Sequence, residues 1–192
     1  FERNDDVLYI CYDNEGYMNT GVQRSSATPP AARTATTPAV GPEPGNVFGT
    51  GKSVPKIAVA HNIPYVATAT VADLHDLERK VTRAMGIHGA RYIQINVPCP
   101  LGWGAASHDT VRLARLAVEC GLYPIFEAEH GKLTHVRKIR RQVRVAEYLK
   151  LQRRFAHLFR DGHEDPRVER LQAICDANIV EYGLIDATAE DA

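Results

Sequence analysis

The sequence predicts an α/β fold in which helices flank a parallel sheet. Short apolar runs at residues 7–12, 65–69, 92–97 and 123–128 alternate with segments of helical periodicity. Such alternation is typical of parallel sheets, whose strands are joined by right-handed helical crossovers. The composition agrees, because 44% hydrophobic and 24% charged residues are ordinary for a globular protein.

The first apolar run is six residues long and ends at Asp13, which predicts a strand buried on both faces. Three apolar patterns predict the helices. The second predicted helix begins after Ser107, a good N-cap residue, and we expect it to end near Cys120, with Gly121 as its C-terminal stop. The apolar positions of the first and third are Leu74, Leu77, Val81, Ala84 and Met85, and Tyr148, Leu151, Phe155, Leu158 and Phe159.

Two segments interrupt this rhythm. Residues 28–52 hold five prolines and predict a long irregular loop, which in a compact domain is usually functional or disordered. The basic stretch at residues 135–144 predicts a second irregular, solvated segment. Beyond Asp161 the pattern is polar and helical. We therefore expect a domain over residues 1–160 and a helical tail over residues 161–192.

The charge and cysteine content exclude several classes of protein. Lys plus Arg (23) equals Asp plus Glu (23), so no overall field favours nucleic acid or a membrane surface. No apolar run could span a bilayer. The four cysteines are widely spaced, which indicates reduced thiols and a cytoplasmic location. The chain lacks an initiator Met and enters a strand at once, so we expect a piece of a longer subunit whose N-terminal portion is missing.

The first candidate site is the segment YDNEGYMNTGVQRSSATP at residues 12–29. It follows the first strand, and ligands of open α/β sheets bind at the carboxyl ends of the strands. Its amide and carbonyl oxygens suit Mg²⁺, which also binds phosphate oxygens. From chemistry alone, a polar strand-to-loop turn without a ligand is the favoured interpretation.

The second candidate is the segment VPCPLGW at residues 97–103. Prolines on both sides of Cys99 hold it in extended backbone at the end of a strand. A single cysteine is a weak metal signal, because iron–sulfur clusters use several thiolates. A buried thiol at a tight turn is the alternative.

Both segments resemble the thiamine-diphosphate-binding beta subunit of 2-oxoacid:ferredoxin oxidoreductases, the group typified by pyruvate:ferredoxin oxidoreductase. Residues 57–69 and 147–155 resemble a helix, a strand and the C-terminal helix of that subunit, so the likeness covers about residues 7–159. It implies the thiamin-diphosphate-binding fold and only the C-terminal part of the subunit. The Gly-Asp-Gly turn of the family is absent from these residues.

The resemblance assigns site residues in the first segment. The Asn14 side chain and the Gly16 carbonyl would bind Mg²⁺, and Tyr17, Asn19 and Thr20 would join them in binding thiamine diphosphate. Asn19 would lie near the reactive end of the cofactor and is the candidate catalytic residue. In the second segment, the resemblance makes Cys99 the last ligand of a [4Fe–4S] cluster.

The activity implied is oxidative decarboxylation of a 2-oxoacid to an acyl-CoA, with electrons passing through [4Fe–4S] clusters to ferredoxin or another acceptor. Partner subunits of alpha, gamma and delta type would complete the enzyme. Pyruvate is the first choice because it is the commonest substrate. Residues 29–33 depart from the Tyr-Gly-Ala of the pyruvate enzymes, so phenylglyoxylate is the runner-up, with branched-chain 2-oxoacids and oxalate also open.

Two further classes stay open. The chain could be part of a thiamine-dependent decarboxylase that has no cluster. It could also be a non-catalytic α/β module that binds a partner through the long loop.

Overall fold

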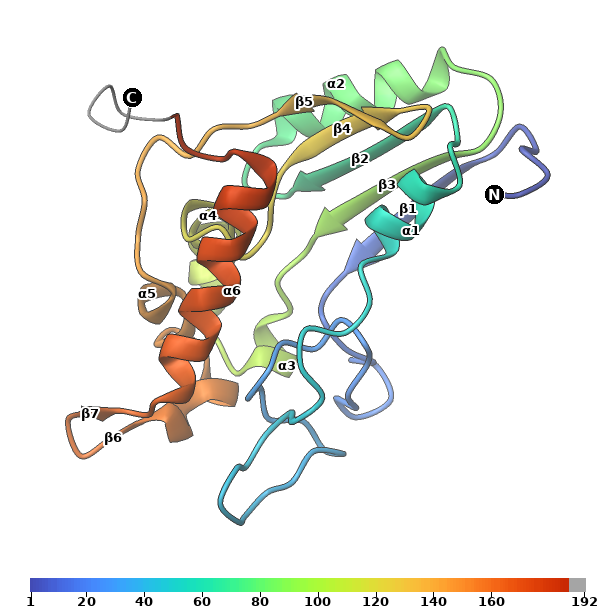
Figure 1. Ribbon diagram of the computed structural model, residues 1–192. Coiled ribbons are helices and arrows are strands. Elements are labelled where there is room, and N and C mark those ends of the chain that lie inside the picture. The colour runs from blue at the N-terminus through green and yellow to red at the C-terminus, as the bar shows by residue number, and fades with distance from the viewer. Residues whose placement is uncertain (187–192) are drawn as a thin grey trace.

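A five-stranded sheet in the order β1-β3-β2-β4-β5 lies at the centre of the computed structural model, which describes residues 1–186 (Figure 1). The strands β1 (Leu8–Asp13), β2 (Tyr65–Thr70) and β3 (Arg91–Asn96) run parallel, in the register Asp13 to Asn96 to Thr70 at their carboxyl ends. The α/β fold with a parallel sheet and flanking helices is therefore confirmed for the half of the chain that carries the first candidate segment.

The other edge of the sheet is antiparallel. The strand expected at residues 123–128 is β4 (Phe126–Glu129), which pairs antiparallel with β2 and forms a hairpin with β5 (Lys132–Val136). His130 and Gly131 make the two-residue turn, both with positive φ (47° and 77°), the conformation that matches the twist of paired strands. The hairpin makes the sheet mixed, and it places His135 and Val136 in a strand rather than in an irregular stretch.

Burial on both faces was the wrong expectation for β1. Tyr9 is 57% and Tyr12 71% exposed, because β1 lies at the edge of the sheet within the described residues. The central strand β2 is buried along its whole length instead.

Helices cover the two faces of the parallel strands. On one face, Ala58 of α1 (Val54–Ala60) packs with Val66 and Tyr92. On the other, α2 (Leu74–Met85) packs Ala84 against Tyr65 and Ile93. The helix at 74–85 is confirmed, but its apolar stripe is narrower than expected, since Leu74 and Met85 are 66% and 68% exposed.

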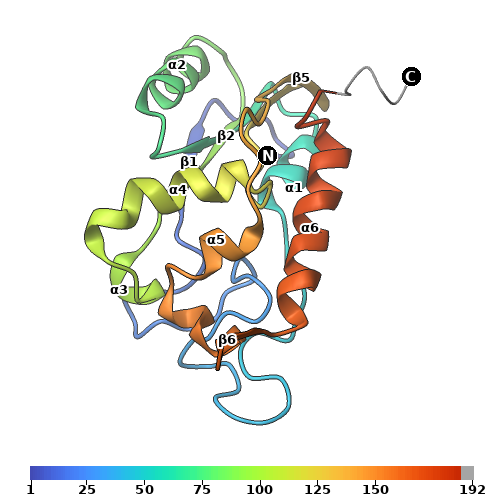
Figure 2. The ribbon, with the colours of Figure 1, turned by 90° about the vertical axis from the view of Figure 1, so that its left-hand side faces the viewer.

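A second core forms beyond the carboxyl ends of the parallel strands. It is built from α3 (Pro100–Trp103), α4 (Thr110–Glu119), α5 (Val145–Leu149) and α6 (Arg167–Tyr182). Figure 2 shows α5 between α4 and α6, and α5 contacts both. The long α6 buries Val168, Leu171 and Cys175 in this core. Residues 187–192 of the expected tail lie outside the described residues.

Shorter elements complete the chain. A 3₁₀ turn at Ser107–Asp109 precedes α4, so the expected start and end of that helix are confirmed to within a few residues. The third predicted helix is split into α5 and a 3₁₀ turn at Arg153–Leu158, because Gln152 between them is extended. The strands β6 (Phe159–Arg160) and β7 (His163–Glu164) form a small hairpin. No helix among residues 1–186 is long and apolar enough to cross a membrane.

Candidate functional site

The two candidate segments, residues 12–29 and 97–103, are far apart in the chain but lie against each other in the structure. The indole Nε1 of Trp103 donates a hydrogen bond of 2.9 Å to the backbone carbonyl of Asn14. Met18 lies directly over Gly102, so that a Cβ at Gly102 would overlap its sulfur. The loop after β1 and the turn that carries Cys99 therefore form one site at the carboxyl ends of β1 and β3.

The loop after β1 is closed by its own backbone. Tyr17 and Gln23 exchange two backbone hydrogen bonds of 3.0 and 3.2 Å, and the Thr20 hydroxyl donates to the Gln23 side chain. A Cβ at Gly16 would come within 2.9 Å of Met18 Cε and 3.1 Å of the Gln23 carbonyl, so only glycine fits there without a shift. The closed turn displays Tyr17, which is 64% exposed, together with Asn19 and Thr20.

The predicted Mg²⁺ ligands offer oxygen atoms that no hydrogen bond within residues 1–186 uses. Among residues 1–186, neither the Asn14 side chain nor the Gly16 carbonyl takes part in a hydrogen bond. Amide and carbonyl oxygens are hard donors of the kind Mg²⁺ prefers, and Mg²⁺ completes its octahedron with water and phosphate oxygens. The donor atoms present therefore fit Mg²⁺, which Asn14 and Gly16 would hold.

Between these two residues, Glu15 has its side chain turned into the protein. Its carboxylate pairs with the guanidinium of Arg154, and the Tyr148 hydroxyl donates to it at 3.5 Å. Burial raises the pKa of Glu15 and the charge of Arg154 opposes that rise. Nothing in the sequence pattern selects Arg154 or Tyr148 as site residues, although both lie in the segment 147–155 that carries part of the resemblance.

Asp13, the last residue of β1, borders the site next to the sheet. The Gln94 amide donates to its carboxylate at 2.7 Å, and the Glu15 backbone N–H donates to it at 2.9 Å. Burial raises the pKa of Asp13, although both hydrogen bonds act against the rise. Asp13 and Gln94 line a cavity of about 400 Å³ that Tyr123 and Lys56 also border. The sequence reading passed over Gln94, which a strand pattern gives no reason to select.

Cys99 lies at the N-terminus of α3, where its Sγ accepts the Gly102 N–H at 3.4 Å. The side chain is half-buried, whereas Cys120 and Cys175 are buried in the core, where the neighbouring Cys120 thiol and then burial raise the pKa of Cys175. Among residues 1–186 no group of three or more His, Cys, Asp and Glu side chains could hold a metal ion. A half-buried thiol that accepts a backbone N–H fits one corner of a cluster whose other ligands come from elsewhere.

Known proteins resemble this chain along most of its length. Residues 1–95 match the family "Thiamine pyrophosphate enzyme, C-terminal TPP binding domain". The chain is 47% identical over 184 residues to "Pyruvate synthase subunit PorB" of Methanosarcina barkeri, an alignment that covers 96% of this chain and 62% of that protein. It is 44% identical over 183 residues to the PorB of Methanocaldococcus jannaschii, with 95% and 59% covered.

A relative whose name gives another substrate matches nearly as well. "Ketoisovalerate oxidoreductase subunit VorB" of Pyrococcus abyssi is 44% identical over 165 residues, covering 85% of this chain and 53% of that protein. A solved 2-oxoglutarate:ferredoxin oxidoreductase from Magnetococcus marinus matches 52% of this chain and 32% of its own at 27% identity, with a TM-score of 0.45, too partial a likeness to carry weight.

The chain thus spans about half to three fifths of the length of the curated relatives it matches. Its loop after β1 lies inside the matched thiamine pyrophosphate domain, and the identity to PorB extends through the Cys99 turn. The chain belongs to the family of thiamine-diphosphate-binding beta subunits of the 2-oxoacid:ferredoxin oxidoreductases.

Proposed function

We propose that this chain holds thiamine diphosphate and Mg²⁺ in an enzyme that oxidatively decarboxylates a 2-oxoacid to an acyl-CoA. The observation that carries the proposal is the closed, glycine-dependent loop at the carboxyl end of β1, packed by Trp103 against the Cys99 turn. When bound, thiamine diphosphate supplies the carbon nucleophile that this reaction needs.

Each residue of the loop has a proposed task. Asn14 and the Gly16 carbonyl bind Mg²⁺, and Tyr17 and Thr20 face the diphosphate. The amide of Asn19 is exposed and forms no hydrogen bond within residues 1–186, so it is available to donate to the reacting substrate. The role of this chain is therefore to bind and orient.

Cys99 is proposed to give one thiolate to a [4Fe–4S] cluster that carries electrons away. The remaining ligands would come from outside the described residues, among which no group of three or more His, Cys, Asp and Glu side chains could hold a metal ion. Ferredoxin or another acceptor, the alpha, gamma and delta type subunits, and a cytoplasmic location belong to the same proposal.

Pyruvate is the proposed substrate, because several of the relatives that match carry the name pyruvate synthase. Branched-chain 2-oxoacids are the second candidate, since a ketoisovalerate oxidoreductase subunit is 44% identical to this chain.

The test uses the complete purified complex. Thiamine diphosphate and iron are quantified, and CoA-dependent reduction of ferredoxin is measured with pyruvate, 2-ketoisovalerate and phenylglyoxylate, each with and without a chelator of Mg²⁺. Pyruvate should give the highest kcat/KM. Decarboxylation without iron would identify a decarboxylase, and a complex with neither cofactor would leave only an interaction module.

A further inference from the structure

The backbone at Glu15 is unusual for its residue type. Glu15 has a φ of 63°, in the left-handed region that residues with a Cβ seldom enter. It stands directly between Asn14 and Gly16, the two residues proposed to bind Mg²⁺. The direction in which the Gly16 carbonyl points relative to the Asn14 side chain therefore depends on this one conformation.

Each polar group of Glu15 is held by a different part of the chain. Its N–H donates to Asp13 at 2.9 Å, and its carbonyl accepts the Thr28 hydroxyl at 2.7 Å. Its carboxylate accepts from Arg154 and Tyr148. A strained conformation persists only when its surroundings determine it more than once, and these contacts do so.

Of the partners of Glu15, Arg154 also contacts the residue that anchors Asn14. Its side chain is 3% exposed, and its Nε donates to Gln152 at 2.8 Å. Its guanidinium carbon lies 4.0 Å from the centre of the Trp103 ring, and Trp103 in turn holds the Asn14 carbonyl. One buried cation thus contacts both the residue between the two proposed ligands and the side chain that anchors the first of them.

We propose that Arg154 is a positioning residue that sets the arrangement of the Mg²⁺ ligands through Glu15 and Trp103. The proposal rests on the function proposed above. Residues that orient metal ligands from behind typically change metal affinity by about 10–100-fold when they are replaced. Arg154 stands behind Asn14 and Gly16 in this way: it contacts Glu15 and Trp103 and forms no hydrogen bond with either proposed ligand.

The test measures Mg²⁺ and thiamine diphosphate affinity by calorimetry in the assembled, cofactor-stripped enzyme. Arg154→Met alone leaves the buried Glu15 carboxylate without its partner, which risks misfolding. The double variant Glu15→Gln/Arg154→Met removes both charges and should keep the assembled fold. We expect its Mg²⁺ dissociation constant to rise about 10–100-fold. Arg154→Lys keeps the charge but loses the planar stacking on Trp103, and we expect an intermediate value.

The matched control is Arg167→Met. Arg167 is also a largely buried arginine paired with an acid, Asp165, but its hydrogen bonds go to Asp165 and the Pro44 carbonyl and none to residues 14–23. It should leave Mg²⁺ affinity unchanged. If the double variant unfolds at the temperature of the unchanged enzyme and binds Mg²⁺ as tightly, the ion pair is structural only and the inference is overturned. If the unchanged enzyme itself shows no Mg²⁺-dependent binding, the proposed function fails instead.

Discussion

Asn14 and Asn19 are amides of one loop with different surroundings. Asn14 is half-buried, with its carbonyl fixed by Trp103, whereas Asn19 is exposed on the closed turn. A half-buried amide on an anchored backbone suits a metal ligand, and an exposed one suits a group that meets the substrate. Replacing each of the two residues by alanine should therefore have a different effect.

We predict that Asn14→Ala weakens Mg²⁺-dependent binding of thiamine diphosphate, because a metal ligand is lost. Asn19→Ala should leave that affinity unchanged and lower kcat by about 10²–10³, the usual loss for one hydrogen-bond donor used in the transition state. Calorimetry and steady-state kinetics on the assembled enzyme measure the two quantities. Weakened cofactor binding with full turnover in Asn19→Ala would contradict this division of tasks.

Cys99 gives a second prediction. Cys99→Ser should weaken or remove the electron paramagnetic resonance signal of one [4Fe–4S] cluster and lower the iron content of the complex, because a serine hydroxyl does not supply the thiolate that holds such clusters. Cys11→Ser is the matched control, since Cys11 is also half-buried but lies within β1. An unchanged spectrum for Cys99→Ser would exclude the ligand role.

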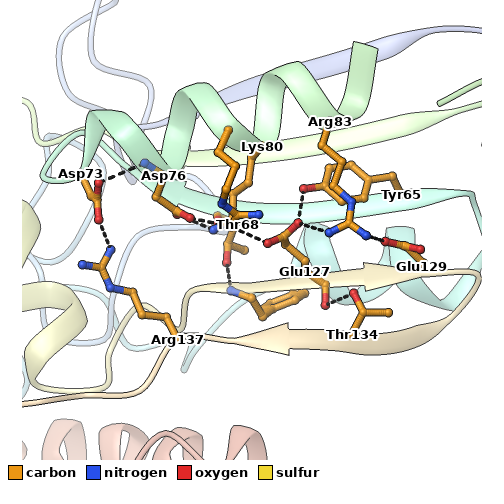
Figure 3. A network of polar contacts seen from close by, with 12 residues as sticks. Tyr65, Thr68, Asp73, Asp76, Lys80, Arg83, Glu127, Glu129, Thr134 and Arg137 are labelled. Atoms are coloured by element: carbon orange, nitrogen blue, oxygen red, sulfur yellow. Dashed lines mark hydrogen bonds and ion pairs between the residues drawn. The ribbon is translucent and has the colours of Figure 1, made fainter. Parts of the chain in front are cut away.

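The β4–β5 hairpin is joined to α2 by a buried network of charges. Glu127 of β4 accepts the Tyr65 hydroxyl at 2.7 Å and pairs with Arg79 at 2.6 Å and Arg83 at 3.2 Å (Figure 3). Burial works against ionisation of Glu127, but these partners outweigh it and hold the pKa below its ordinary value. The fully buried Lys80 completes the network through Asp76 and the Thr68 carbonyl.

We predict that Glu127→Ala lowers the free energy of unfolding by about 1–3 kcal/mol, mainly because the buried Tyr65 hydroxyl loses its acceptor. The lost ion pairs add little, since Arg79 and Arg83 are half exposed. Glu129→Ala, at the neighbouring and more exposed pair with Arg83, should cost less than about 1 kcal/mol. Chemical denaturation of the purified protein measures both. Equal effects of the two changes would mean that the network adds no more than surface pairs do.

The elements with a strong local pattern could be predicted from the sequence, and those set by distant contacts could not. The apolar run ending at Asp13 and the helix ending at Cys120 are local, and both elements are present, although the expected N-cap Ser107 lies in the 3₁₀ turn instead. The β4–β5 hairpin depends on a His130–Gly131 turn that lacks the usual Asn-Gly or Asp-Gly signal. The pairing of Glu15 with Arg154 joins residues 139 positions apart, which no periodicity reveals.

For the molecule as a whole, His157 links stability to pH. It is 7% exposed, and neither ring nitrogen has a hydrogen-bond partner within residues 1–186. Burial, together with the charges of Arg167 and Arg33, lowers its pKa to about 4. The unfolded chain takes up this proton near pH 6.5, so stability falls as the pH drops from about 6.5 towards 4.

We predict that His157→Phe loses less stability between pH 7 and pH 4.5 than the unchanged protein, by up to about 3 kcal/mol. Melting temperatures across that range measure the difference. His163→Phe, at an exposed histidine of β7, is the control and should keep the original pH dependence. If the melting temperatures of all three proteins fall equally between pH 7 and pH 4.5, His157 does not cause the loss of stability at acid pH.

The stacked position of Trp103 makes the site visible by spectroscopy. It is the one tryptophan of the sequence, it is fully buried, and its ring meets Arg154 on its face and the Asn14 carbonyl at its nitrogen. All indole fluorescence of this chain therefore originates beside the proposed cofactor loop. A shift of its emission reports movement of that loop, and the chain carries its own optical probe for the step in which the cofactor binds.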